Sequence, residues 1–226
     1  MNRVRWFRAS LPMSLRSIAA KISSSPLELD GDMGFKVEKV RSETVDASYY
    51  ERFSWTESGV DPFGREFSFE RVGYKVVRFT LSKNYPELEV IDAPRGLSSF
   101  FSRIAELTDF EATIEPLRID VLNWASALRN SYTSSFRVAS MSVSDLGVEE
   151  GITGSLTVSS RDQDVKGAVG RLLSRRTYSV QRVQVVMRSR ASDASLTLIS
   201  DGSVKSSADI DPDILIAVRG SMPPHQ

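Results

Sequence analysis

Histidine and cysteine, the residue types most used in acid–base, nucleophilic and zinc chemistry, are almost missing from this chain. The sequence contains no cysteine, and its single histidine is His225, the penultimate residue. Disulfides, thiolate nucleophiles, Cys/His zinc sites and histidine relays are therefore not expected. A serine nucleophile would need a lysine base, and no S-x-x-K occurs with its supporting motifs. The sequence gives no positive support for an enzyme, although chemistry by carboxylates alone stays open.

Glycine-rich phosphate loops are also missing, since neither G-x-x-x-x-G-K-[ST] nor G-x-G-x-x-G occurs. The segment Gly167-Ala168-Val169-Gly170 has the G-x-x-G form of an RNA-binding KH loop, with Lys166 and Arg171 beside it. KH loops connect two helices, whereas these glycines fall inside one stretch of helical apolar spacing. That position favours close helix packing over RNA binding. We expect no nucleotide cofactor.

Three alternating carboxylates, Asp209, Asp211 and Asp213, are the best candidates for metal ligands. The run lacks the glycine and the terminal glutamate of a calcium-binding loop. Asp-Pro-Asp is instead typical of a solvated turn, here before a strand predicted over Ile214–Val218. We expect no metal site.

The positive functional signal is a basic segment at 161–190, where eight basic residues face two acidic ones, giving a net charge of +6. Strand alternation predicts one face with Tyr178, Val180, Arg182, Gln184 and Arg188, and an opposite face with Val183, Val185 and Met187. The candidate contact residues are Arg171, Arg175, Arg176, Tyr178, Arg182, Gln184, Arg188 and Arg190, with Tyr74 and Arg78 on an earlier strand.

Two functions fit such a face. Arginine and tyrosine are favoured at protein interfaces, which indicates a non-catalytic interaction or scaffold subunit that contacts a protein partner in a larger assembly. The same groups could stack bases and hold phosphates, so a nucleic-acid-binding module is the alternative. Against both, Arg175 and Arg176 suit a helix C-terminus without any ligand. We expect the protein partner first.

Composition places the chain among ordinary globular proteins. It has 226 residues, 29 basic and 29 acidic, and no apolar run of the roughly 20 residues that a membrane helix needs. We therefore expect a soluble cytoplasmic protein without membrane association. No acidic residue precedes Glu28, so targeting to an organelle by a basic N-terminal segment is a minor alternative.

Apolar spacing predicts the elements that would position these side chains. Helical spacing appears over 15–22, over 97–104, over 121–128 after the N-cap candidate Asp120, and over 165–172 before Arg175 and Arg176. Strands are expected near 4–9, 49–55, 67–81, 88–91, 110–118, 134–143, 152–159, 177–188 and 195–199. Turns are expected at Asp61-Pro62-Phe63-Gly64 and, as a two-residue hairpin, at Asp201-Gly202. The 97–104 helix should cover the strand at 77–81.

Strands and helices that mix without regular alternation indicate an α+β fold, with a largely antiparallel sheet packed by three to four helices. A Tyr-x-Val-x-Arg pattern at Tyr74 and again at Tyr178 raises a duplicated unit as a further expectation. The expected organisation is a strand–helix unit at 1–25, a β-rich meander with two helices at 26–132, a second α+β unit at 133–220 and a tail at 221–226. One continuous domain is the alternative.

Overall fold

Sheet dominates this protein. The computed structural model describes residues 3–29, 31–131, 135–188 and 193–224. Strands account for 48% and helices for 22% of the described residues, which form eleven strands and five helices. The chain divides into two compact units, which we call the N-terminal unit (Ala9–Ile114) and the C-terminal unit (Met1–Arg8 with Glu115–Gln226).

The N-terminal unit is a four-stranded antiparallel meander with two helices. Its strand order follows the chain, through β2 (Met33–Val40), β3 (Thr44–Val60), β4 (Glu66–Ser82) and β5 (Leu88–Ile91). Helix α1 (Leu15–Ser23) packs on β2 and β3 and contacts α2 (Ser98–Leu107). The apolar stripe predicted for α1 is confirmed, because Leu15, Ile18, Ala19 and Ile22 are all buried.

Aromatic side chains form the core of this unit. The Phe100 ring of α2 lies 4.8 Å from the Phe79 ring of β4 and 5.8 Å from the Tyr49 ring of β3. Phe35 of β2 completes the cluster at 5.1 Å from Tyr49. The predicted packing of the 97–104 helix on the 77–81 strand is confirmed at Phe100, whereas its neighbour Phe101 is only half-buried.

The C-terminal unit contains six antiparallel strands. The strand order is β1 (Arg3–Ser10), β11 (Ser203–Ser206), β10 (Asp193–Ile199), β9 (Ser179–Arg188), β7 (Ser135–Glu149) and β8 (Ile152–Ser159). The unit also contains α3 (Val121–Ser131), α4 (Lys166–Leu172) and α5 (Pro212–Gly220), while β6 (Thr113–Pro116) lies where the two units meet in the sequence.

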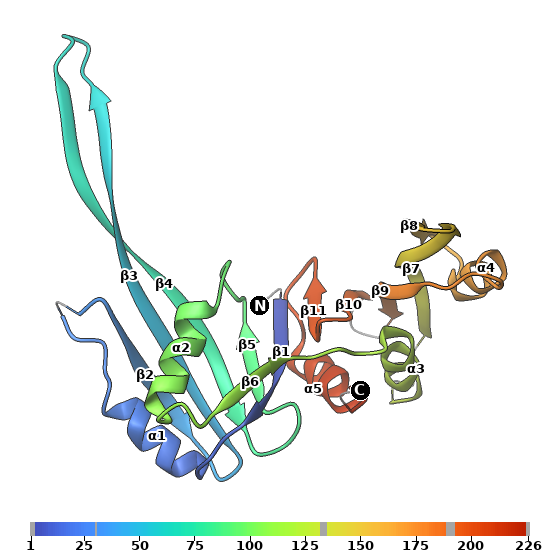
Figure 1. The fold of residues 1–226 in the computed structure, drawn as a ribbon, viewed down its shortest axis with the longest axis horizontal. Helices are drawn as coiled ribbons and strands as arrows, with labels where there is room; N and C mark the ends of the chain where they lie inside the picture. Colours follow the sequence, from blue (N-terminus) through green and yellow to red (C-terminus); the bar gives the residue numbers. More distant parts are fainter. Residues whose placement is uncertain (1–2, 30, 132–134, 189–192, 225–226) are drawn as a thin grey trace. The chain divides into compact units, whose positions relative to one another are not determined.

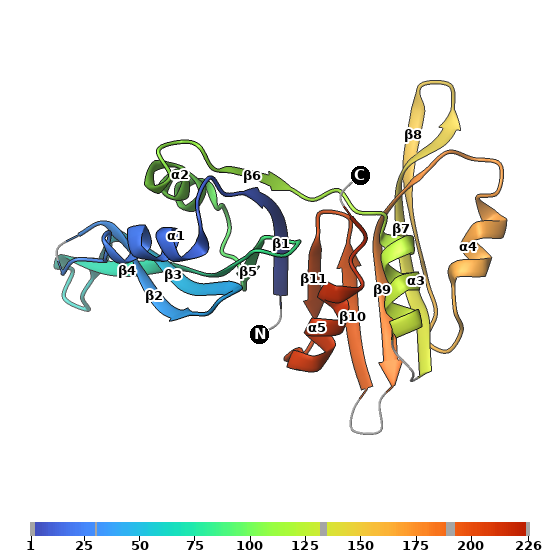
Figure 2. The ribbon, with the colours of Figure 1, turned by 90° about the horizontal axis from the view of Figure 1, so that it is seen from below.

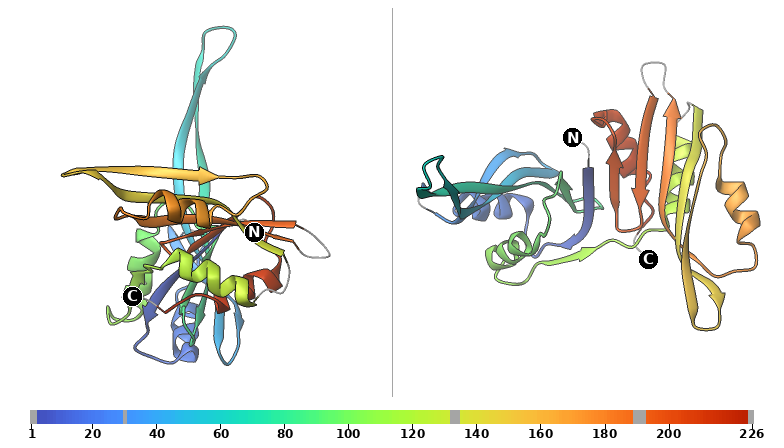
Figure 3. Two further views of the ribbon diagram at one scale, coloured as in Figure 1. Left: turned by 90° about the vertical axis from the view of Figure 1, so that its right-hand side faces the viewer. Right: turned by 90° about the horizontal axis from the view of Figure 1, so that it is seen from above.

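Helices cover one face of these six strands. Helix α3 packs on β9 and β10 and contacts α5, and Figure 2 shows α3 and α5 in front of the strands. The indole Nε1 of Trp124 in α3 donates a hydrogen bond to the Val218 carbonyl of α5 (2.9 Å). Asp120 caps α3 as predicted, accepting from the backbone N–H groups of Leu122 and Asn123. In the right-hand view of Figure 3 the strands lie in front of these helices.

The expectation of an α+β sheet packed by three to four helices is wrong. The antiparallel sheet is confirmed, but the five helices of the described chain have only seven to eleven residues. Strands β3 and β4 alone have 17 residues each. The expected duplication also fails, since β4 pairs with its sequence neighbours β3 and β5, whereas β9 pairs with β7 and β10.

The segment predicted as a strand over Ile214–Val218 is a helix. The carboxylate of Asp211 accepts from the backbone N–H of Asp213 (2.8 Å), and Pro212 stands at the first helical position. An aspartate at the N-cap and a proline at the first helical position are both common at the start of a helix, so Asp-Pro-Asp begins this helix. Ile214 and Val218 are buried one turn apart, which a five-residue apolar run does not distinguish from a strand.

Two further local predictions need correction. The buried residue of α4 is Val169, and the cap residues Val165 and Leu173 on either side of the helix are buried with it, whereas Leu172 is exposed. The apolar spacing is therefore i, i+4, i+8. The β10–β11 loop has three residues between the paired Ile199 and Ser203, one more than predicted. The turn at 61–64 is confirmed, with Gly64 at φ 82° and the Asp61 carboxylate accepting from two backbone N–H groups.

Candidate interaction surfaces

The predicted basic face is only partly assembled. Arg182 is exposed on β9 and lies opposite Ser142 and Ile199. Gln184, two residues along, donates from its side-chain amide to Ser195 Oγ (2.9 Å). The opposite face is as predicted, because Val183, Val185 and Met187 are buried.

An irregularity in β9 separates the aromatic residue from the arginine. The register with β7 shifts so that Arg182 pairs with Ser142, but Val180 pairs with Val143, which is buried. Tyr178 precedes the first residue of the strand and is half-buried. The regular alternation that placed Tyr178 and Arg182 on one face is therefore interrupted at residue 181.

The other basic candidates belong to different elements. Arg171 lies on α4, and Arg175 and Arg176 lie in the turn that follows it; all three are exposed. The Arg176 guanidinium donates to the Gly147 carbonyl (3.1 Å). The side chain of Arg188 and the whole of Arg190 lie outside the described residues.

The last two candidates lie in the N-terminal unit, on β4. Tyr74 and Arg78 are exposed and share one face of the strand, opposite the face that buries Val77 and Phe79. The structure places Tyr74 at the base of a feature that the sequence analysis did not identify.

That feature is a two-stranded arm formed by the distal halves of β3 and β4, residues 53–73. The outermost residue of β3 paired with β2 is Glu51, and pairing of β4 with β5 stops at Arg78. Beyond these points, eight residue pairs from Phe53–Gly73 to Val60–Glu66 hold the two strands to each other. Figure 1 shows the arm extending past the ends of β2 and β5.

All four aromatic residues of the arm's strands lie on one face. Because strand residues alternate, the pairs Phe53–Gly73, Trp55–Arg71, Glu57–Phe69 and Gly59–Phe67 share a face. We call this face the aromatic platform. Its rings are 39–50% exposed, with Phe69 the least and Phe53 and Phe67 the most exposed. Exposed aromatic clusters of this kind are unusual on a monomer and mark interaction sites.

The rings on the platform are stacked and oriented. Phe53 stacks on Trp55 with 5.6 Å between ring centroids, and Phe67 stacks on Phe69 at 6.2 Å with nearly parallel planes. The Arg71 guanidinium lies 4.7 Å from the centre of the Phe69 ring and forms an ion pair with Glu57. The two charges neutralise each other, so the platform is an apolar, electrically balanced surface.

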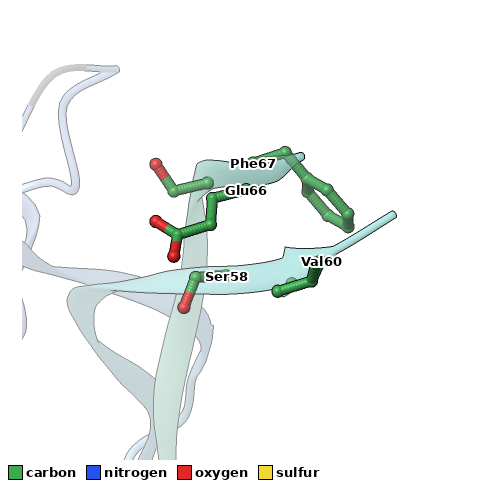
Figure 4. Close-up of a pocket in the computed structure, with 6 residues that line it drawn as sticks. Ser58, Val60, Glu66 and Phe67 are labelled. Atoms are coloured by element: carbon green, nitrogen blue, oxygen red, sulfur yellow. The ribbon is translucent and has the colours of Figure 1, made fainter. Parts of the chain in front are cut away.

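The opposite face of the arm is polar by comparison. It carries Ser54, Thr56, Ser58, Glu66, Ser68 and Glu70, with Val60 and Val72. Figure 4 shows the distal end, where the Phe67 ring and the Glu66 carboxylate point to opposite sides of the ribbon. The open hollow there is lined by Ser58–Val60 and Glu66–Ser68. Its lining contains no histidine, cysteine or basic residue, and we assign no chemistry to it.

A short repeat in the sequence could have revealed the platform. Phe53-Ser54-Trp55 precedes Gly59 with the same spacing by which Phe67-Ser68-Phe69 precedes Gly73. The two copies are joined by the predicted turn, so they face each other as antiparallel strands. The signal was present, but it becomes meaningful only once the strands are known to extend beyond their neighbours.

Metal sites and membrane-spanning helices are two further features that the described residues do not show. Among these residues no group of three or more His, Asp or Glu side chains is placed to hold a metal ion. Within the same part of the chain, no helix is long and apolar enough to cross a membrane. No protein-family model matches the sequence, and no curated protein matches it significantly.

Proposed function

We propose that this protein is a non-catalytic subunit of a larger assembly and that it contacts a protein partner through the aromatic platform of the arm. The observation that carries the proposal is the exposure of Phe53, Trp55, Phe67 and Phe69 on one face of an otherwise unsupported ribbon. Two-stranded hairpins are marginally stable alone in water, so a partner surface packed over the platform would stabilise the arm. Aromatic residues and arginine are also the residue types that dominate binding energy at interfaces.

The chemistry of the arm favours protein over nucleic acid. Residues 53–73 contain four acidic and two basic side chains, a net charge of −2. Phosphate groups would be repelled by this charge, whereas an apolar and neutral protein surface would not. The partner surface is therefore expected to be largely apolar and to carry no net charge.

The test compares two faces of the same arm. Trp55→Ser with Phe69→Ser removes two platform rings, and the control Val60→Ser with Val72→Ser removes exposed apolar side chains (64% and 44%) from the opposite face. Chemical crosslinking in the native host, followed by mass spectrometry, would give the stoichiometric complex. Its loss in the platform variant alone is expected. Retention in the platform variant, or equal loss in both, contradicts the proposal.

A second candidate function, nucleic-acid binding, is favoured by the face of the C-terminal sheet away from α3. There Arg182 is surrounded by hydroxyl and amide side chains of the neighbouring strands, among them Ser142, Thr157, Gln184, Ser195 and Thr197. Arginine, serine, threonine and glutamine are common phosphate-contacting residues. Arg182→Glu should then weaken binding of a labelled oligonucleotide at about 50 mM salt, a condition that favours phosphate contacts. The control is Arg129→Glu on α3. Undetectable binding by the unmodified protein excludes this candidate.

A further inference from the structure

The residues of the aromatic platform are related by an approximate twofold axis perpendicular to its surface. A half-turn about this axis exchanges β3 with β4 and the base of the arm with its tip. It exchanges Phe53 with Phe67, Trp55 with Phe69, Glu57 with Arg71, and Gly59 with Gly73. The exchange therefore places aromatic residues at aromatic positions and glycine at glycine positions. It places the acidic residue of the charged pair at the position of the basic one.

We infer from this symmetry that the partner of the platform is the platform of a second copy of this chain. This inference rests on the proposed function, because it identifies the partner that the proposal leaves open. Like surfaces meet in an isologous dimer, whose twofold axis lies in the interface. Such a dimer requires one surface that is complementary to itself.

The platform meets that requirement in both orientations that a dimer axis in its plane allows. With the axis along the arm, each Phe53 faces Gly73 of the second copy and each Trp55 faces Arg71. With the axis across the arm, Phe53 faces Gly59 and Arg71 faces Phe69. Because the Phe53 ring lies over Gly73 and the Phe67 ring over Gly59 of the same chain, both orientations bring phenylalanine rings of the two copies together. Both also place a guanidinium against an aromatic ring, a favourable cation–π arrangement.

Charge also favours self-pairing. Glu57 and Arg71 are the charged residues of the platform, and with the axis across the arm each lies nearest its opposite on the second copy, because Glu57 then faces Trp55, the cross-strand neighbour of Arg71. The remaining acidic groups of the arm lie elsewhere. Glu66 and Glu70 point to the opposite face, and Asp61 is in the turn. With the axis across the arm, two platforms can thus approach with opposite charges as the nearest charged pair.

The area of the platform predicts a weak dimer. A fully buried aromatic side chain covers about 150–250 Å², so four rings at their observed exposures offer roughly 350 Å² per copy, or roughly 700 Å² in a pair. Arg71, Glu57 and the glycine backbone between them extend the pair to about 1,000 Å², the lower limit for a specific interface. A dissociation constant of about micromolar order is expected.

The first experiment is sedimentation velocity of the purified protein over a range of concentrations. The unmodified chain and the opposite-face control, Val60→Ser with Val72→Ser, should shift from monomer to dimer as concentration rises. Trp55→Ser with Phe69→Ser should remain monomeric, with an unchanged melting temperature. An unmodified chain that stays monomeric at about 100 μM, well above the expected constant, overturns the inference.

The second experiment identifies the contacting residues by charge. Glu57→Arg alone and Arg71→Glu alone each place like charges on both platforms of a homodimer, so each variant should dimerise at least tenfold more weakly. An equimolar mixture should regain dimerisation, because two basic groups then face two acidic ones. No recovery on mixing overturns the inference even if the unmodified chain is dimeric.

The outcomes also separate this inference from the proposed function. A monomeric chain that forms a platform-dependent complex with a different protein in the native host refutes the second copy and leaves the assembly role intact. A monomer whose native complexes are unaffected by Trp55→Ser with Phe69→Ser refutes both.

Discussion

Phe53 lies opposite Gly73 on the arm, and its ring occupies the space that a side chain at position 73 would enter. A Cβ atom built there would lie 2.8 Å from Phe53 Cζ and 3.1 Å from Trp55 Cζ3. The same relation holds at the other end of the platform, where a Cβ at Gly59 would lie 2.7 Å from Phe67 Cζ. The two glycines thus let the phenylalanine rings lie across the ribbon, which keeps the platform flat.

Gly73→Val should separate association from stability. The added methyl groups push the end of the Phe53 side chain aside, and this flexible side chain can rotate outward into solvent. Valine suits a strand, so unfolding free energy should change by less than about 1 kcal/mol. Dimerisation, measured by sedimentation, should weaken severalfold because the platform is no longer flat. Ser54→Val on the opposite face is the matched control, and equal affinities for the two variants would contradict the role given to Gly73.

The sequence was sufficient to predict the hairpin but not its exposure. Turn residues at Asp61 to Gly64 and two β-rich flanks predict that β3 and β4 pair, and they do. Whether a strand end is covered depends on where β2 and β5 stop, which is a tertiary fact. Alternation therefore predicts that Phe53 and Trp55 share a face but does not distinguish a core face from an open one.

Prediction of the basic face was also limited by information that only the pairing of strands supplies. Strand periodicity correctly separated Arg182 and Gln184 from Val183 and Val185. It failed at Tyr178, because the register shift near residue 181 is set by pairing with β7 and has no marker such as glycine or proline in β9. A single extra residue is enough to move a side chain to the other face.

Substitutions at Asp211 test whether this residue caps α5, the helix that the sequence analysis expected to be a strand. Asp211→Ala removes the cap that accepts from the Asp213 backbone N–H and should cost about 1 kcal/mol of unfolding free energy in urea melts. Asp211→Asn preserves a good capping residue and should be nearly neutral. Equal losses for the two variants would mean that the carboxylate acts in some other way.

Phe100 tests the core of the N-terminal unit. The side chain is 1% exposed and contacts the rings of Tyr49, Phe79 and Phe101. Phe100→Ala should lower the unfolding free energy by about 3–5 kcal/mol through lost burial and a cavity. Phe101→Ala, at the half-buried neighbouring position, should cost clearly less. A larger loss for Phe101→Ala in denaturant melts would reverse the assignment of the core face of α2.

The raised pKa of Tyr49 leads us to expect a loss of folding stability at alkaline pH. Burial raises the pKa of the Tyr49 phenol above its ordinary value of 10.0, and the nearby Glu51 carboxylate raises it further. The folded protein therefore holds this proton more tightly than the unfolded chain does. The resulting stability is fully present below about pH 10 and is lost as pH rises through the folded-state pKa. Tyr49→Phe should show a smaller fall in urea midpoint between pH 8 and pH 11, and an identical fall would contradict the assignment.

Trp55 offers the most direct measurement of whether the platform is covered. It is 46% exposed, whereas Trp6 and Trp124, the other two tryptophans, are fully buried. Acrylamide quenching of fluorescence, compared between the unmodified protein and Trp55→Phe, isolates the signal of Trp55. The account predicts that Trp55 is strongly quenched in dilute protein and becomes protected as concentration rises, in parallel with dimer formation. The claim that the platform is an interface would be contradicted if Trp55 were quenched equally at every protein concentration and were still quenched equally after crosslinking in the native host.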